Sequence, residues 1–240
     1  MDEITRKADE LMGQNRWKEA EALFVYCKDA AARKGDKALE LSLCSELLGF
    51  YRMRAIREGF ETALARTMEL LRELDVSLPG RGTILVNAAT GLVSFGETEK
   101  AMPLYQEAYG CFLRSLPPED FRFAALFNNM ASAFQRHGDY DRAEEHFRMA
   151  MGVLEKHPHH PDVATSYVNL AALYAEQDRE DPRIGECLDE AMKTLDDPEM
   201  LWDGYYAHTA RKCAGAFAAL GRPDRGAELE ERAALLYEGT

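Results

Sequence analysis

Hydrophobic positions along this chain recur with the spacing of helix faces, and whole helical segments recur about every 40 residues. The clearest stretch runs from Phe121 to His157, where two amphipathic segments flank Gly138-Asp139. A pair of helices joined by a tight turn cannot bury its apolar stripe alone, so neighbouring pairs must stack. The pattern predicts an all-α solenoid of helical hairpins, in which each repeat contacts only its neighbours.

Small residues at fixed spacings set the register of these hairpins. Three loop glycines each precede a small residue by five positions: Gly96 and Ala101, Gly138 and Ala143, Gly221 and Gly226. One asparagine occupies an equivalent place in three first helices: Asn87, Asn129 and Asn169. We expect a single domain over residues 1–240 with six repeats, approximately 1–35, 36–79, 80–118, 119–160, 161–197 and 198–240.

The fourth repeat resembles the tetratricopeptide repeat family. It reads Phe127-x₂-Met130-Ala131-x₂-Phe134, followed by Ala143-x₃-Phe147 and Ala150. The third and fifth repeats keep this pattern, as Leu85-x₂-Ala88-Ala89-x₂-Leu92 and Tyr167-x₂-Leu170-Ala171-x₂-Tyr174. The repeats exceed the 34 residues usual for the family, and the Asn128–Ala131 and Val168–Ala171 strings are similar to the kinesin-light-chain-like subgroup. The resemblance implies a right-handed superhelix whose first helices line a concave groove.

The second repeat does not fit this register cleanly. Leu47-Leu48-Gly49 is a candidate for its close-packed segment, but Gly59 then falls too late for the usual turn. Prolines mark several expected joints between helices. Pro182 and Pro223 are expected at first helical positions, and Pro103 in the first turn of its helix, where a missing N–H is tolerated.

Charge and composition narrow the classes of partner. A formal net charge of −13 argues against DNA, RNA or an anionic membrane surface as the main partner. Acidic stretches such as Asp178-Arg179-Glu180-Asp181 are typical of solvated helix faces. The sequence has neither a secretory signal nor an apolar run long enough to span a membrane, so we expect a cytoplasmic protein. The five scattered cysteines are expected to be reduced packing residues.

Sequence motifs for catalysis or cofactor binding are absent. The chain contains no Gly-rich phosphate loop, HExxH, CxxC or GxSxG, so we expect no enzyme activity and no cofactor. One histidine cluster, His157-Pro158-His159-His160-Pro161-Asp162, offers three imidazoles and a carboxylate that could bind a transition metal. The alternative is an exposed linker between two repeats, which we favour because structural metal sites usually draw ligands from separated segments. The prediction is therefore no metal site.

The resemblance to tetratricopeptide repeats implies a peptide-binding site on the first helices. Amide side chains suit an extended peptide, because they donate to and accept from its backbone. A basic pair in the last repeat could take an acidic group. The predicted peptide-binding residues are Asn87, Asn128, Asn129, Gln135, Asn169, Arg211 and Lys212. The alternative is that the asparagines bond neighbouring helices and that the basic pair only faces solvent.

The function predicted from these features is a non-enzymatic scaffold or adaptor that binds a protein or peptide segment, with an acidic segment as one candidate. The alternative is a peptide-sensing regulator of the tetratricopeptide type, although repeats filling 240 residues leave no space for an appended effector domain. We expect a monomer with a capping last helix over residues 224–237. A weak homodimer through Leu235, Leu236 and Tyr237 is the alternative.

Overall fold

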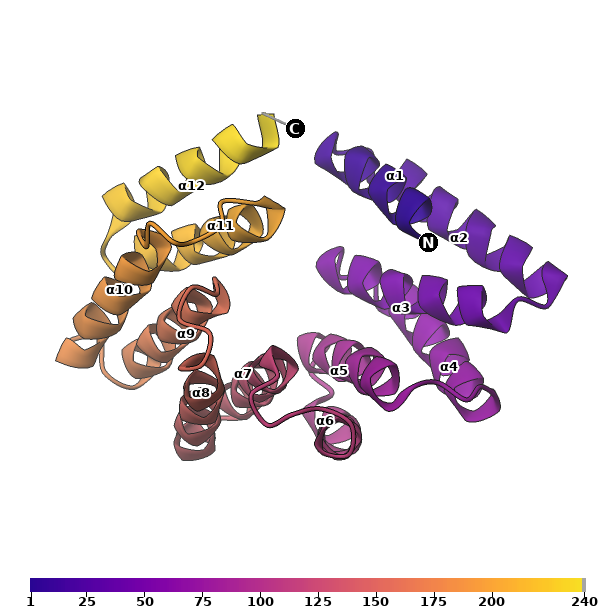
Figure 1. The fold of residues 1–240 in the computed structure, drawn as a ribbon, viewed down its shortest axis with the longest axis horizontal. Coiled ribbons are helices and arrows are strands. Elements are labelled where there is room, and N and C mark those ends of the chain that lie inside the picture. Colours follow the sequence, from indigo (N-terminus) through magenta and orange to yellow (C-terminus); the bar gives the residue numbers. More distant parts are fainter. Residues whose placement is uncertain (239–240) are drawn as a thin grey trace. The chain divides into compact units, whose positions relative to one another are not determined.

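The computed structural model describes residues 1–238 and contains twelve α-helices and no strand in that range (Figure 1). The helices are α1 (Asp2–Gly13), α2 (Trp17–Lys34), α3 (Lys37–Met53), α4 (Arg57–Glu73), α5 (Leu78–Ser94), α6 (Thr98–Leu113), α7 (Phe121–Arg136), α8 (Tyr140–Leu154), α9 (Asp162–Gln177), α10 (Pro182–Leu195), α11 (Gly204–Ala219) and α12 (Pro223–Glu238). The fold class predicted from the sequence, an all-α solenoid of helical hairpins, is confirmed.

Consecutive helices pair as six hairpins, and the chain divides into two compact units. The first unit, Met1–Leu116, contains the hairpins α1/α2, α3/α4 and α5/α6. The second, Pro117–Thr240, contains α7/α8, α9/α10 and α11/α12. In the second unit α9 packs against both α7 and α11, so the three first helices form one row and α8, α10 and α12 lie on its other side (Figure 1). The prediction of one domain over residues 1–240 stays a prediction.

Residues with a left-handed backbone conformation form the turns of five hairpins. One of them fixes the register of the irregular second repeat. Gly96, Gly138 and Gly221 have φ angles of 82°, 82° and 88°, as expected for the loop glycines. Asn15 and Ala55 take the equivalent places, with φ angles of 60° and 54°. The turn of the second repeat is therefore at Ala55, and Gly59 lies inside α4.

Small side chains lie where α7 and α8 cross. Ala131 on α7 and Ala143 and Ala150 on α8 are all fully buried, as is Phe147. Small residues allow the two helix axes to approach closely, while the aromatic ring fills the space beside the crossing. This agrees with the pattern from which the hairpin was predicted.

The hairpin α3/α4 solves the same packing problem with a large side chain. Counted from the turn at Ala55, Phe60 stands where Ala143 stands in α8, and it is 1% exposed. Its ring packs against Gly91 of α5, because a Cβ atom built on Gly91 would lie 2.0 Å from Cε2 of Phe60. The next hairpin therefore provides the space that α3/α4 lacks.

The prolines show one correction to the sequence prediction. Pro182 and Pro223 are the first residues of α10 and α12, as expected. Pro103, predicted in the first turn, lies inside α6, because that helix begins at Thr98. A residue here would normally donate its N–H to a carbonyl four positions earlier, and proline cannot. The helix continues to Leu113 on its packing against α5.

Candidate peptide-binding face

The first helices of the second unit present one aligned series of polar residues. Asn129 on α7, Asn169 on α9 and Lys212 on α11 occupy the same repeat position, each two residues before the buried small residue of its helix: Ala131, Ala171 or Ala214. Asn129 and Asn169 are half-buried and Lys212 is exposed. We call Asn129, Asn169 and Lys212 the polar row. Sequence reasoning identified each member, but did not recognise Lys212 as the continuation of the asparagine series.

Asn129 already uses part of its hydrogen-bonding capacity within its own helix. Its Nδ2 donates to the carbonyl of Ala125 at 2.8 Å. A primary amide has a second N–H and two acceptor lone pairs, so this bond does not exhaust it. The structure thus shows an internal contact for Asn129, while its predicted role in peptide binding stays a prediction.

Asn128 faces the neighbouring first helix instead. It is 9% exposed, and its Nδ2 donates to Oγ of Ser166 on α9 at 2.9 Å. The Ser166 hydroxyl in turn donates to the carbonyl of Asp162 at 3.0 Å. Oδ1 of Asn128 is buried and has no hydrogen-bond partner among the described residues. In this arrangement Asn128 joins α7 to α9, which is the internal alternative weighed for the asparagines.

Arg211 and Lys212 belong to different repeat positions, although they are adjacent in sequence. Arg211 is equivalent to Asn128 and Val168, which are buried between successive first helices. Arg211 itself is exposed. Its Nε lies 3.6 Å from Oε2 of Glu230 on α12, which holds the guanidinium near that hairpin.

Two predicted site residues remain, Gln135 and Asn87, and His208 lies beside the predicted basic pair. Gln135 is half-buried in the last turn of α7. His208 is exposed on α11, one turn before Lys212, so this end of the polar row is basic. Asn87 is exposed on α5 and therefore belongs to the first unit. The structure brings Asn129, Asn169 and Lys212 into one row and leaves Asn87 to a separate unit.

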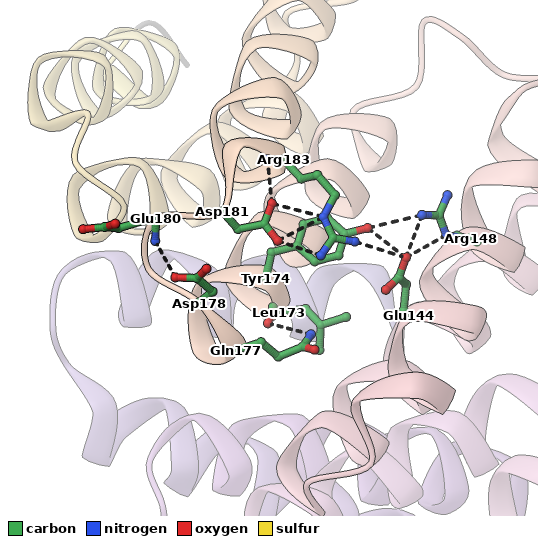
Figure 2. A network of polar contacts seen from close by, with 9 residues as sticks. All are labelled: Glu144, Arg148, Leu173, Tyr174, Gln177, Asp178, Glu180, Asp181 and Arg183. Atoms are coloured by element: carbon green, nitrogen blue, oxygen red, sulfur yellow. Dashed lines mark hydrogen bonds and ion pairs between the residues drawn. The ribbon is translucent and has the colours of Figure 1, made fainter.

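Sequence reasoning missed a polar network between α8, α9 and α10. Figure 2 shows Glu144 and Arg148 from α8, Tyr174 from α9, and Asp181 and Arg183 at the start of α10. Tyr174 donates to Oε1 of Glu144 at 3.0 Å, and Arg148 donates to the same oxygen at 2.6 Å. The Arg183 guanidinium lies 3.9 Å from the centre of the Tyr174 ring. Tyr174 and Glu144 are 30 residues apart in sequence, so no local motif reveals their contact.

Electrostatics within this network favour the ionised carboxylates. Burial alone would raise the pKa of Glu144, but hydrogen bonds from Arg148 and Tyr174 hold that pKa below its ordinary value. The Arg183 side chain lowers the pKa of Asp181 in the same way. Burial and the nearby Glu144 raise the pKa of Tyr174, so its phenol stays protonated and donates. Because its members satisfy one another, we interpret the network as a clamp between α8, α9 and α10.

The histidine cluster does not converge on one point. His157 Nε2 lies 2.6 Å from the carbonyl of Glu119, and His159 Nδ1 lies 2.8 Å from Oδ2 of Asp197. The His160 ring stacks on Phe121 instead, with ring centres 5.6 Å apart. Within residues 1–238 no group of three or more His, Cys, Asp or Glu side chains is placed to hold a metal ion.

The cysteines lie in helix-packing positions as free thiols. Cys44, Cys111 and Cys213 are buried, and Cys27 and Cys187 are half-buried. Burial raises the pKa of the Cys44, Cys187 and Cys213 thiols to about 11. A thiol with so high a pKa is a poor nucleophile at neutral pH.

Of the helices described, none is sufficiently long and apolar to cross a membrane.

Comparison with known proteins agrees with the repeat pattern. Residues 122–182, which span α7, α8, α9 and the start of α10, match the family model described as tetratricopeptide repeat. No curated protein matches the chain. The resemblance to tetratricopeptide repeats predicted from the sequence is confirmed by this match and by the solved structures that share the fold.

Three solved structures illustrate that likeness. BtubC (BKLC) from P. vanneervenii aligns with 94% of this chain and 91% of its own, at 18% identity and a TM-score of 0.60. A putative kinesin light chain with nearly identical TPR-like repeats, from Podosopora anserina, aligns with 83% of this chain and 95% of its own, at 18% identity and 0.53. PilW, a type IV pilus biogenesis factor, aligns with 100% and 94%, at 13% identity and 0.59. At these identities the likeness establishes the fold alone.

Proposed function

We propose that this protein, built from tetratricopeptide-like hairpins, is a non-enzymatic scaffold that holds a polypeptide partner against the first helices of its second unit. The observation that carries the proposal is the polar row, in which Asn129, Asn169 and Lys212 repeat one position on three successive helices. Amides at a regular interval suit a peptide backbone, whose N–H and C=O groups also recur at a regular interval.

The basic end of the polar row favours a partner with acidic side chains or a terminal carboxylate. Lys212, Arg211 and His208 are exposed together on α11, in a chain whose net charge is −13. Such a local exception to the overall charge selects anionic groups and speeds their association. Exposed charges are screened over about 8–10 Å at physiological salt, so binding should weaken as salt rises.

The proposal is tested on a partner segment that is captured with the 240-residue chain by pull-down, identified by mass spectrometry and then made as a synthetic peptide. Titration calorimetry compares the parent with Asn169→Ala, Lys212→Glu and Arg179→Glu. Arg179 is an exposed residue between α9 and α10, so its variant makes the same change of charge away from the polar row. Melting curves for every variant control for loss of folding.

The expected result separates the polar row from general charge effects. Asn169→Ala should weaken binding by about 1–3 kcal/mol if a buried peptide group loses its partner. Lys212→Glu should weaken binding and reduce its dependence on salt, whereas Arg179→Glu should leave the affinity close to the parent value. Equal losses for Lys212→Glu and Arg179→Glu, with no effect of Asn169→Ala, would place the binding surface elsewhere.

A further inference from the structure

A pocket of about 300 Å³ opens between α8, α9 and α10, away from the polar row. Its apolar wall includes Leu154 and Val163, and the ring of Tyr167 also lines it. Three carboxylates line its rim, from Glu155, Glu190 and Asp197. Lys193 is the one cation among the lining residues, and its Nζ forms an ion pair with Oε2 of Glu190 at 3.2 Å. The pocket therefore combines an apolar interior with an excess of negative charge.

The equivalent junction in the third repeat is filled by an arginine of the protein itself. Arg81 of α5 donates to the carbonyl of Leu71, in the last turn of α4, at 2.7 Å. The same guanidinium donates to Oε1 of Glu107 on α6 at 2.9 and 2.7 Å. A buried leucine carbonyl at the end of one second helix and a glutamate on the next together hold this guanidinium.

The junction between the fifth and sixth repeats is also filled by an arginine, which comes from a different helix. Arg232 of α12 donates to the carbonyl of Leu195, in the last turn of α10, at 3.4 Å. It also donates to Oδ1 of Asp196 at 2.6 Å and to the Tyr206 hydroxyl at 3.2 Å. Its guanidinium lies 5.4 Å from the Trp202 ring centre. A last-turn leucine carbonyl and a nearby carboxylate again receive the guanidinium.

The pocket is the same junction without its arginine. Val163 takes the place of Arg81, since each lies six residues before the asparagine that aligns the first helices. Glu190 takes the place of Arg232, since each follows the crossing residue of its second helix, Ile184 or Gly226, by six positions. The equivalent acceptors are present: Leu154 is equivalent to Leu71 and Leu195, Glu190 to Glu107, and Glu155 to Asp196. The Leu154 carbonyl already accepts from the His157 N–H at 2.8 Å, which leaves its second lone pair for a guanidinium.

We propose that this pocket binds the guanidinium of an arginine side chain supplied by a polypeptide partner. The planar group would face Glu155, Glu190 and the end of α8, while Val163 and Tyr167 cover its aliphatic stem. The last turns of α8 and α10 both border the pocket, and helix C-termini favour a cation. This site lies outside the polar row and does not depend on the function proposed for that row.

The charge around Tyr167 supports this assignment. Burial, followed by the charge of Glu190, raises the pKa of the Tyr167 phenol, and Glu155 acts in the same direction. Lys193 acts in the opposite direction. The lining therefore sets three carboxylates against one ammonium group, and this balance of charge favours a cation in the pocket.

The test uses NMR titration of the 240-residue chain with N-acetyl-arginine-amide. The matched probe is N-acetyl-citrulline-amide, which has nearly the same shape but no charge. We expect saturable shifts of the Glu155, Tyr167 and Thr194 amide signals with the arginine probe, and at least tenfold weaker shifts with the citrulline probe. Free arginine distinguishes the source of the ligand, and we expect it to bind no tighter than the blocked form.

Two variants should fill the pocket from within. Glu190→Arg copies the arrangement of Arg232, and Val163→Arg copies that of Arg81 while keeping Glu190. Each should abolish the saturable shifts, and each should melt at or above the parent temperature, because the new arginine meets acceptors that are already in place. Glu186→Arg is the control, since it makes the same change of charge as Glu190→Arg at an exposed position of α10 outside the pocket lining. It should retain most of the binding.

Four results would overturn the proposal. The arginine probe could give no saturable shifts at the pocket, or the citrulline probe could bind equally well. Equal loss of binding in Glu186→Arg and Glu190→Arg, with Val163→Arg still binding, would show a general attraction of charge. Free arginine binding tenfold tighter than the blocked form would exclude a polypeptide source.

Discussion

The hairpins α3/α4 and α7/α8 form equivalent crossings with opposite side chains. In α7/α8 the crossing position is Ala143, and the hairpin closes on its own small residues. In α3/α4 the same position is Phe60, whose ring is received by Gly91 in the next hairpin. The difference shows that a small residue at the crossing is not indispensable. What the fold requires is a matching volume on the neighbouring helix, whichever hairpin supplies it.

The largest loss of stability is expected for Phe60→Ala. The ring is buried and contacts both Gly91 and Phe95, the latter with ring centres 5.0 Å apart. Its removal should leave a cavity and cost about 3–5 kcal/mol of unfolding free energy, although alanine is the natural residue at this position of α8. Chemical denaturation measures the loss. A cost below 1 kcal/mol would mean that the crossing closes on alanine as it does in α7/α8.

The next effect is expected for Gly91→Ala. The added methyl group would meet the Phe60 ring at 2.0 Å, so the substitution should destabilise the protein by about 1–3 kcal/mol despite the better helix propensity of alanine. The matched control is Gly49→Ala on α3, where an added Cβ atom meets nothing within 4 Å. The control should be neutral or stabilising by up to about 1 kcal/mol. Denaturant midpoints that are equal for the two variants would contradict the predicted contact.

A smaller effect should distinguish the residues that follow the two crossing positions. Glu144 follows Ala143 and is 25% exposed within the polar network, whereas Glu61 follows Phe60 and is 60% exposed beside Arg57. Glu144→Gln should cost about 1 kcal/mol, because Arg148 and Tyr174 lose a charged acceptor. Glu61→Gln should stay within about 0.5 kcal/mol, as exposed ion pairs contribute little. Thermal melts of both variants at neutral pH provide the measurement.

The Glu144 effect should depend on pH in a defined direction. Its pKa in the folded protein lies below the ordinary value, so its ionised form stabilises the fold above that ordinary value. This stabilisation is lost as the pH falls through the lowered pKa of the folded state. The stability gap between the parent and Glu144→Gln should therefore be widest near neutral pH and close in acid. A gap that stays constant down to acid pH would show that Glu144 contributes through packing alone.

The sequence predicted the hairpins well because their signals are local and periodic. Glycine adopts positive φ angles readily, so a glycine between two helical segments predicts a turn. The structure shows such φ angles at Gly96, Gly138 and Gly221. Ala55 makes an equivalent turn without such a signal, so the second repeat could not be aligned in advance. Pro103 was misplaced because the packing of α6 on α5 outweighs its lost hydrogen bond.

The candidate site was predictable only in part. Spacing identified Asn129 and Asn169 as equivalent, yet spacing could not show that Asn128 is buried against Ser166. Neighbours in a helix differ by about 100° in direction, so one position separates a surface side chain from an interhelical one. The contacts of Arg81, Arg183 and Arg232 join residues from different helices. The three arginines occupy different repeat positions, so the sequence period does not locate their contacts and the structure reveals them.

The reception of Phe60 by Gly91 has a consequence for dissecting the chain. Part of the packing of one hairpin is supplied by residues of the next hairpin, so a single hairpin does not contain all the contacts that bury its core. A fragment that stops after α4 would lose the Gly91 surface that covers the Phe60 ring. If α5/α6 followed a different hairpin, the space beside Gly91 would be empty. A fragment designed for transfer to another protein should therefore contain both α3/α4 and α5/α6, so that Phe60 and Gly91 stay together.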